Sequence, residues 1–262
     1  MPGWRTRLCS MSAGDAVPML RDRVRQWRLR MHLRGMGDAQ LRTGLTAFVL
    51  LTKRGNRMKY QELRSDLKTG DILLFSGKGG ISDGIKFFTL SKYSHVAMVY
   101  RFDDPRDPKG SVFCWESTTL SDVHDADSGK LTKGVQRVEL SERLERCFSL
   151  GYEVSVRQLS RSLSDKMLTA LNNFRHDVSG RPYETSRIEL LKAAYDGLFG
   201  DNKEDLSSLF CSELVAEAYQ SMGLLSEAMP SNEYIPKDFS QERQLRLQMD
   251  YRLQNEIDIH SL

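Results

Sequence analysis

The sequence contains no long hydrophobic run. Its most apolar stretch, LTAFVLL at residues 45–51, is far shorter than the roughly 20 residues that a transmembrane helix needs. No small-residue cleavage site of a secretory signal follows this stretch, and no internal repeat is visible. These absences argue against a transmembrane segment and predict a soluble protein, which we expect to be cytoplasmic.

The sequence also lacks the spacings that define metal and phosphate sites. The four cysteines show no C-x-x-C spacing, so we expect reduced thiols and no zinc site. The glycine-rich stretch SGKGG at residues 76–80 lacks the G-x-x-x-x-G-K-S/T pattern of a phosphate-binding loop. The cysteines are Cys9, Cys114, Cys147 and Cys211.

The net charge of +3 is the sum of a strongly basic N-terminal part and an acidic remainder. Residues 1–57 carry twelve Lys and Arg against three Asp and Glu, a net charge of +9, whereas the other 205 residues carry a net charge of −6. The basic part has no sustained helical face, so we expect a disordered extension that makes at most weak contact with an anionic surface. Met58 opens a segment that suits a natural start, and residues 58–262 are expected to form the folded domain. Stable binding to nucleic acid or insertion into a membrane is not expected.

Hydrophobic periodicity predicts strands first and helices later. Period-two alternation indicates strands at 71–75, 95–101, 111–116 and 152–158. Helical spacing and capping residues indicate helices at 82–90, 141–148, 164–180, 186–200 and 207–225, and a polar surface helix over 240–254. This order predicts an α+β domain in which helices pack on one side of a small, mostly antiparallel sheet.

Cys211 is the candidate nucleophile. We predict that it lies in the first turn of the helix at 207–225, where free backbone N–H groups and the helix dipole favour a thiolate. It shares an apolar stripe with Val215, Ala218 and Met222, so it should face the body of the protein. A small buried hydrophobic residue would show the same pattern.

A cysteine nucleophile needs a base, and the base needs a group that fixes its orientation. His95 begins an otherwise apolar strand, whereas the other histidines after residue 58 fall in a loop, a helix end and the tail. Glu116 ends the next strand, and strand pairing can bring its carboxylate beside the imidazole. A structural core histidine and an exposed strand-end glutamate are the alternative readings of these two residues.

Four segments in this order resemble the circularly permuted papain-like cysteine hydrolases of the NlpC superfamily, and look most like the YiiX-like branch. A more distant likeness is to the lecithin:retinol acyltransferase group. The resemblance covers roughly residues 65–240. The segments are GDILLFSGKGGISDGIKFFTLSKYSHVAMVY, FCWES, GRPYE and LFCSELVAEAYQ.

The resemblance implies a permuted papain-like fold with the nucleophile at a helix N-terminus. It makes Cys211 the nucleophile, His95 the base and Glu116 the orienting acid. It also places Tyr183 beside the active site, where it helps to position an oxyanion, and makes Pro236 structural. No metal or organic cofactor is implied. The interval between Tyr183 and Cys211 is long, and the signal peptide of exported members is not evident, which argues against peptidoglycan as the substrate.

The resulting hypothesis is a cysteine hydrolase of the peptidase or amidase type. It would cleave an amide or ester bond in a peptide, amide or acyl-lipid substrate through an acyl-cysteine intermediate, with the Cys211 N–H helping to hold the oxyanion. Two alternatives stay open. The same residues could serve a lipid-directed acyltransferase or thioesterase, which the basic extension would favour, or the domain could be a catalytically silent binding module.

Overall fold

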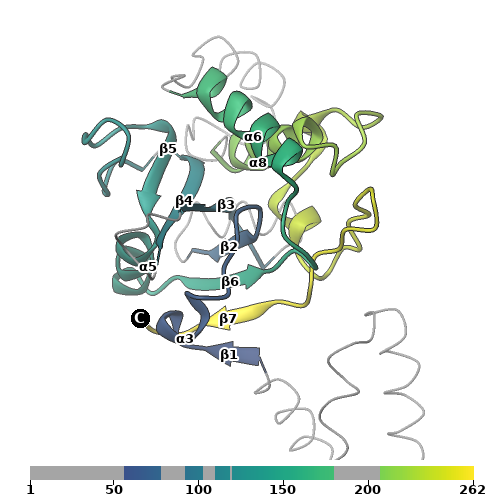
Figure 1. Cartoon of the computed structure of the whole chain (residues 1–262). Helices are drawn as coiled ribbons and strands as arrows, with labels where there is room; N and C mark the ends of the chain where they lie inside the picture. Colours follow the sequence, from purple (N-terminus) through teal and green to yellow (C-terminus); the bar gives the residue numbers. More distant parts are fainter. Residues whose placement is uncertain (1–55, 78–91, 103–109, 119, 180–206) are drawn as a thin grey trace, which may run out of the picture. The chain divides into compact units, whose positions relative to one another are not determined.

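The computed structural model describes residues 56–77, 92–102, 110–118, 120–179 and 207–262 (Figure 1). The chain divides into two compact units, Met1–Asn56 and Arg57–Leu262. All described helices and strands belong to the second unit, and Arg57 is part of it, one residue before the predicted start at Met58. The helices predicted at 82–90 and 186–200, most of the basic extension and Tyr183 lie outside the described residues.

A seven-stranded sheet forms the centre of this unit. All neighbouring strands are antiparallel except β1 and β7, which run parallel. The α+β class and the mostly antiparallel sheet are therefore confirmed, and the four predicted strands agree with β2, β3, β4 and β6 to within two residues at each end. In sheet order the strands are β1 (Arg57–Met58), β7 (Ile257–Ile259), β6 (Glu153–Arg157), β2 (Ile72–Ser76), β3 (His95–Phe102), β4 (Ser111–Thr118) and β5 (Gly134–Glu139).

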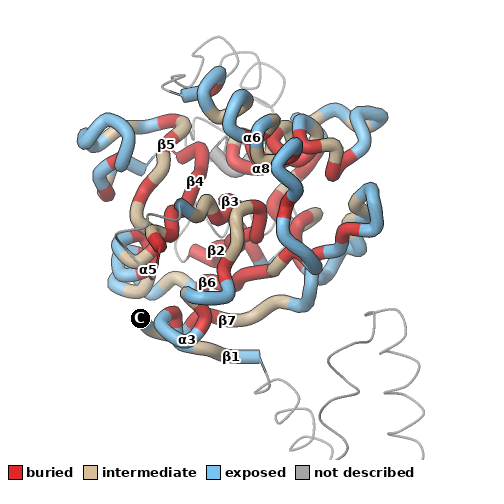
Figure 2. Tube along the Cα trace, viewed as in Figure 1, coloured by how far each residue is buried: buried red, intermediate tan, exposed pale blue. Residues whose placement is uncertain are grey.

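The helices cover both faces of the sheet, so the expectation that they pack on one side was wrong. Side chains alternate along a strand, and in β2 Leu74 joins one apolar cluster while Leu73 joins another. The first cluster packs against α6 (Asp165–Val178) and α8 (Ser207–Ser221), and the second against α3 (Tyr60–Leu63) and α5 (Leu140–Ser149). β2, at the centre of the sheet, is consequently buried along its whole length (Figure 2).

Local sequence explains where α6 begins. Ser164 is its N-cap, and its side-chain oxygen accepts a hydrogen bond from the Met167 N–H at 3.4 Å. Asp165 lies in the first turn and Arg175 and His176 in the last, which matches the helix dipole at both ends. No helix in the described ranges is long and apolar enough to cross a membrane.

The prediction of a surface helix over 240–254 was wrong. After a short 3-10 helix at Pro236–Phe239, the chain runs without helix to β7. The buried Arg157 guanidinium donates hydrogen bonds to four backbone carbonyls at the two ends of this segment, which attaches both ends to β6. The carbonyls belong to Phe239, Ser240, Leu253 and Gln254.

Candidate active site

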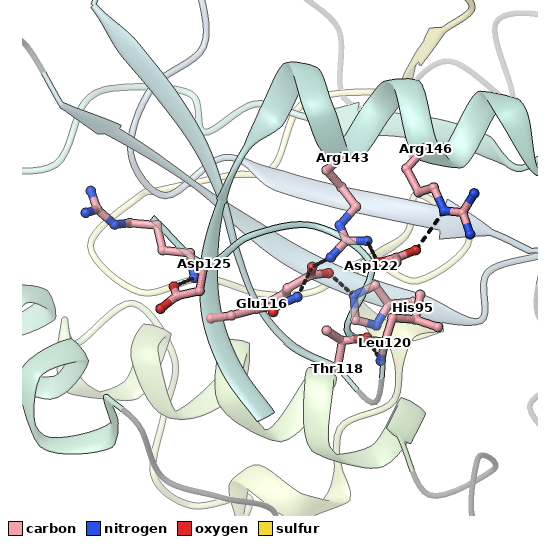
Figure 3. Close-up of polar contacts among 10 residues, drawn as sticks. His95, Glu116, Thr118, Leu120, Asp122, Asp125, Arg143 and Arg146 are labelled. Carbon is pink, nitrogen blue, oxygen red and sulfur yellow. Dashed lines mark hydrogen bonds and ion pairs between the residues drawn. The ribbon is translucent and has the colours of Figure 1, made fainter. Parts of the chain in front are cut away.

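His95 and Glu116 form a hydrogen-bonded pair at one end of the sheet. The β3–β4 pairing pairs Met98 with Trp115, and extending that register by one residue puts Ala97 opposite Glu116. His95 lies two residues before Ala97, so it shares a face with Glu116 and lies diagonal to it. The His95 Nε2 and Glu116 Oε2 atoms are 2.7 Å apart (Figure 3). Strand pairing thus brings together two side chains that are 21 residues apart.

Glu116 is buried, with only 2% of its side chain exposed. Gln136, directly opposite on β5, donates a hydrogen bond from Nε2 to Glu116 Oε1 at 3.1 Å, and Arg143 Nη2 lies 2.6 Å from the same oxygen. Burial alone would raise the pKa of Glu116, but the Arg143 charge and the His95 contact outweigh it and lower that pKa to about 2. The carboxylate is therefore ionised at neutral pH.

Arg143 connects Glu116 to the surface through two further residues. Its Nη1 donates to Asp122 Oδ1 at 2.9 Å, and the other Asp122 oxygen accepts from Arg146 Nε at 3.0 Å. Burial lowers the pKa of Arg143, but the Glu116 charge and the Asp122 contact raise it overall, so the guanidinium stays charged. The chain of contacts from His95 to Arg146 is visible in Figure 3.

Cys211 also interacts with the His95 side chain. It lies on α8 and is fully buried, as are Val215 and Ala218, which confirms the predicted apolar stripe. Burial lowers the pKa of His95, but the Cys211 charge, a hydrogen bond between the two side chains and the Glu116 contact raise it to about 10. Because Nε2 is engaged by Glu116, Nδ1 is the ring nitrogen left for the sulfur.

The helix that carries Cys211 already includes Ser207, one of the two serines expected to cap it. Ser207 is already helical, so Cys211 is the fifth residue of α8 and lies beyond the first turn. In an α-helix the N–H of the fifth residue bonds to the carbonyl of the first. The Cys211 N–H is therefore paired with the Ser207 backbone, and its prediction as an oxyanion donor at the helix N-terminus was wrong. Sequence could not place this start, because both Ser207 and Ser208 suit a cap.

The remaining predicted residues occupy other places. His124, His176 and His260 are all exposed, as their positions in a loop, a helix end and the tail suggested. Pro236 is buried at the start of its 3-10 helix, as expected of a structural residue. Just before it, the Tyr234 carbonyl accepts a hydrogen bond from the Ser212 hydroxyl at 2.6 Å, which attaches this segment to α8. Tyr183 lies outside the described residues.

The sequence did not lead us to predict Gln136, Arg143 or Asp122 as residues of this site. Gln136 lies on a strand that was not predicted. Arg143 and Arg146 are three residues apart on one helix and so share a face, which is the one signal that could have paired them with a common acid. Within the described ranges, no group of three or more His, Cys, Asp or Glu side chains is placed to hold a metal ion.

Comparisons with known proteins do not show a family for this chain. No protein-family model matches the chain, and no curated protein matches it. Among solved structures, it is similar to the crystal structure of the metalloprotein YiiX (DUF1105) from Escherichia coli O157:H7. That similarity has 17% sequence identity and a TM-score of 0.38, and covers 73% of this chain and 88% of YiiX. At these values the similarity assigns neither an activity nor any site residue.

Proposed function

We propose that the folded unit is a cysteine hydrolase with a permuted papain-like arrangement, in which Cys211 is the nucleophile, His95 the base and Glu116 the orienting acid. One observation carries the proposal. His95 Nε2 lies 2.7 Å from the buried Glu116 carboxylate, and the same imidazole is hydrogen-bonded to the Cys211 side chain. A base held between a nucleophile and an orienting acid is the arrangement that covalent acyl transfer needs.

The electrostatics favour an ion pair before the substrate binds. The raised pKa of His95 keeps the imidazole protonated at neutral pH, and the Cys211 charge is the largest contribution that raises it. A thiolate beside an imidazolium is the reactive form of a cysteine nucleophile. The ionised Glu116 stabilises the imidazolium from the other side and holds the ring in one orientation.

The reaction then follows two steps. The Cys211 thiolate attacks the carbonyl carbon of an amide or ester, and His95 gives its Nδ1 proton to the leaving nitrogen or oxygen as the acyl–sulfur bond forms. In the second step His95 takes a proton from water, the hydroxide attacks the acyl-cysteine, and the thiolate leaves. Because the Cys211 N–H is engaged in α8, we assign the oxyanion contact to Tyr183 on the resemblance alone.

The pH dependence of thiol alkylation tests the proposal without a known substrate. Cys211 labelling by iodoacetamide, read by mass spectrometry, is expected to proceed well below pH 8.5, roughly the pKa of a free thiol, and to slow by about tenfold or more in His95→Ala. The exposed His124→Ala is the matched control and should label like the wild type. Labelling that is indifferent to His95 would refute the thiolate–imidazolium pair and favour the binding module.

The same protein provides an internal standard for this assay. Cys114 and Cys147 are buried thiols on the opposite face of the sheet, and burial raises the pKa of Cys147 to about 12. Both are expected to label much more slowly than Cys211. Once the pair is established, a thioester probe offered with and without a primary amine would separate hydrolysis from acyl transfer, because only transfer yields an amide.

A further inference from the structure

We propose that Arg143 is a positioning residue of this site, which holds Glu116 ionised and in contact with His95. The assignment rests on the proposed function, because Glu116 can influence the reaction only if His95 and Cys211 form the reacting pair. Arg143 lies on α5, outside all four segments that carry the family resemblance.

The contact between Arg143 and Glu116 is electrostatic rather than a directed hydrogen bond. Arg143 Nη2 lies 2.6 Å from Glu116 Oε1 with both side chains almost fully buried, yet this nitrogen has no hydrogen bond of acceptable geometry. The directed hydrogen bond of the guanidinium goes instead from Nη1 to Asp122. Asp122 therefore sets where the guanidinium lies, and its positive charge acts on Glu116 at short range.

A count of the charges around Glu116 shows why this cation is needed. In the reactive form, the site holds a thiolate, an imidazolium and the Glu116 carboxylate, a net charge of −1 in a buried place. Arg143 brings the sum to zero, and Arg146 does the same for Asp122 nearer the surface. Among the described residues, the titratable and charged groups that interact with Glu116 directly or through one of its partners are His95, Cys211, Cys114, Cys147, Arg143, Arg146 and Asp122.

The two other thiols in that set add no charge. Burial is the main cause that raises the pKa of Cys114 and of Cys147, so both stay neutral over the working range. Gln136 donates a hydrogen bond to Glu116 but carries no charge. Within the part of the chain that the structure describes, Arg143 is consequently the cation beside Glu116 whose charge does not depend on the state of the reacting pair.

Removing Arg143 should therefore shift the pH dependence of Cys211 alkylation. Without the guanidinium, the uncompensated burial of Glu116 lets it bind a proton at higher pH. A neutral carboxyl stabilises the imidazolium less, so the proton shared by the pair shifts from His95 towards the sulfur, and alkylation requires a higher pH. A residue that serves only the stability of α5 would change the amount of folded protein and leave this pH unchanged.

The experiment measures Cys211 alkylation by iodoacetamide in the full-length protein from about pH 4 to about pH 9, and takes the pH of half-maximal rate as the midpoint. Arg143→Gln is expected to raise the midpoint by about one pH unit, because a nearby opposite charge shifts a carboxyl pKa by about 1–3 units. Arg143→Lys keeps the charge but holds it farther from Oε1, so its midpoint should fall between those of the wild type and Arg143→Gln. Circular dichroism checks that each variant is folded.

Two comparisons make the result specific. In a Glu116→Gln background, adding Arg143→Gln or Arg143→Lys should produce no further shift, since the group on which Arg143 acts is gone. Arg137→Gln is the matched control. Arg137 lies on β5, is paired with Asp127 and has its guanidinium over the Phe113 ring of β4. Its loss should leave the midpoint unchanged.

Each outcome decides the assignment. An unchanged midpoint in both Arg143 variants, or equal shifts with and without Glu116, would overturn it while the proposed function stands, provided that His95→Ala still slows labelling. If His95→Ala labels like the wild type, the proposed function fails and the assignment fails with it. If Arg143→Gln does not fold, an upward shift in Arg143→Lys that disappears in the Glu116→Gln background supports the assignment, and the lack of such a shift refutes it.

Discussion

The substitution Glu116→Gln tests the electrostatics of the site through stability alone. The side chain is 2% exposed, and its charge is compensated by Arg143 and His95. The neutral amide leaves the buried Arg143 with Asp122 as its one carboxylate contact among the described residues. Breaking a buried ion pair from one side costs about 3–5 kcal/mol, so we expect a loss of that size in the free energy of unfolding at pH 7.

The pH dependence of this loss follows from the pKa of Glu116. Folding lowers that pKa from 4.5 to about 2, so the ionised carboxylate stabilises the fold above pH 4.5 by about 3 kcal/mol. The contribution is lost as the pH falls from about 4.5 to about 2, because protonation in the folded state removes the favourable charge. About 2 kcal/mol of it should be lost by about pH 3. The glutamine variant has no such carboxyl, so the gap between the two proteins should narrow by that amount.

Urea unfolding followed by circular dichroism between about pH 6 and pH 3 measures this gap. Other carboxyl groups titrate in both proteins and largely cancel in the difference. Glu142→Gln, an exposed carboxylate on the same helix as Arg143, is the control and should change stability by less than about 0.5 kcal/mol at each pH. A gap that stays constant from pH 6 to pH 3 would refute the reasoning, because Glu116 would then not be held ionised by its neighbours.

Three further predictions concern packing, each measured by urea unfolding at pH 7. Gly70→Ala should lower the free energy of unfolding more than Gly129→Ala. Both glycines have positive φ, +97° and +68°, where an alanine is strained by about 1–2 kcal/mol. Only at Gly70 would the new Cβ also clash, at 2.8 Å from Leu159 Cδ1. Equal losses would contradict the clash. Tyr219→Phe removes a buried 2.6 Å hydrogen bond to the Gly70 carbonyl and should cost about 1–3 kcal/mol, and a loss under about 0.5 kcal/mol would contradict this. Trp115→Ala should cost about 3–5 kcal/mol because the side chain is 1% exposed, and a loss under about 2 kcal/mol would mean that the cavity collapses.

Strands rich in apolar and β-branched residues could be predicted from the sequence, and short strands with distant partners could not. In β2 and β3 nearly every residue is apolar or β-branched, so the pattern is clear within one segment. β7 has three residues, and its partner β6 lies about 100 residues earlier, so no local pattern marks it. The tail at 240–254 carries enough polar residues for a surface helix, but hydrogen bonds from the distant Arg157 hold it in another conformation.

The placement of helices was also beyond a local reading. Apolar spacing in α5 predicts a helix but does not say which face of the sheet it covers. Leu144 and Cys147 belong to the apolar cluster on the sheet face opposite α8. The direction in which the chain leaves β5 decides which face α5 covers. The start of α8 likewise depends on more than its two serines, and moving it by one or two residues changes whether the Cys211 N–H is free.

The sequence by itself determined the kinds of group that are available: a cysteine on an apolar helical stripe, a histidine at the start of a buried strand and a glutamate on the next strand. These follow from local periodicity, which depends on residues within a few positions of one another. Only the tertiary structure decided that His95 and Glu116 are in contact, that Cys211 reaches the same imidazole, and that Arg143 compensates the buried charge. Those contacts join residues between about 20 and 120 positions apart, and their distances depend on strand register and on how the helices pack against the sheet, which no local pattern specifies.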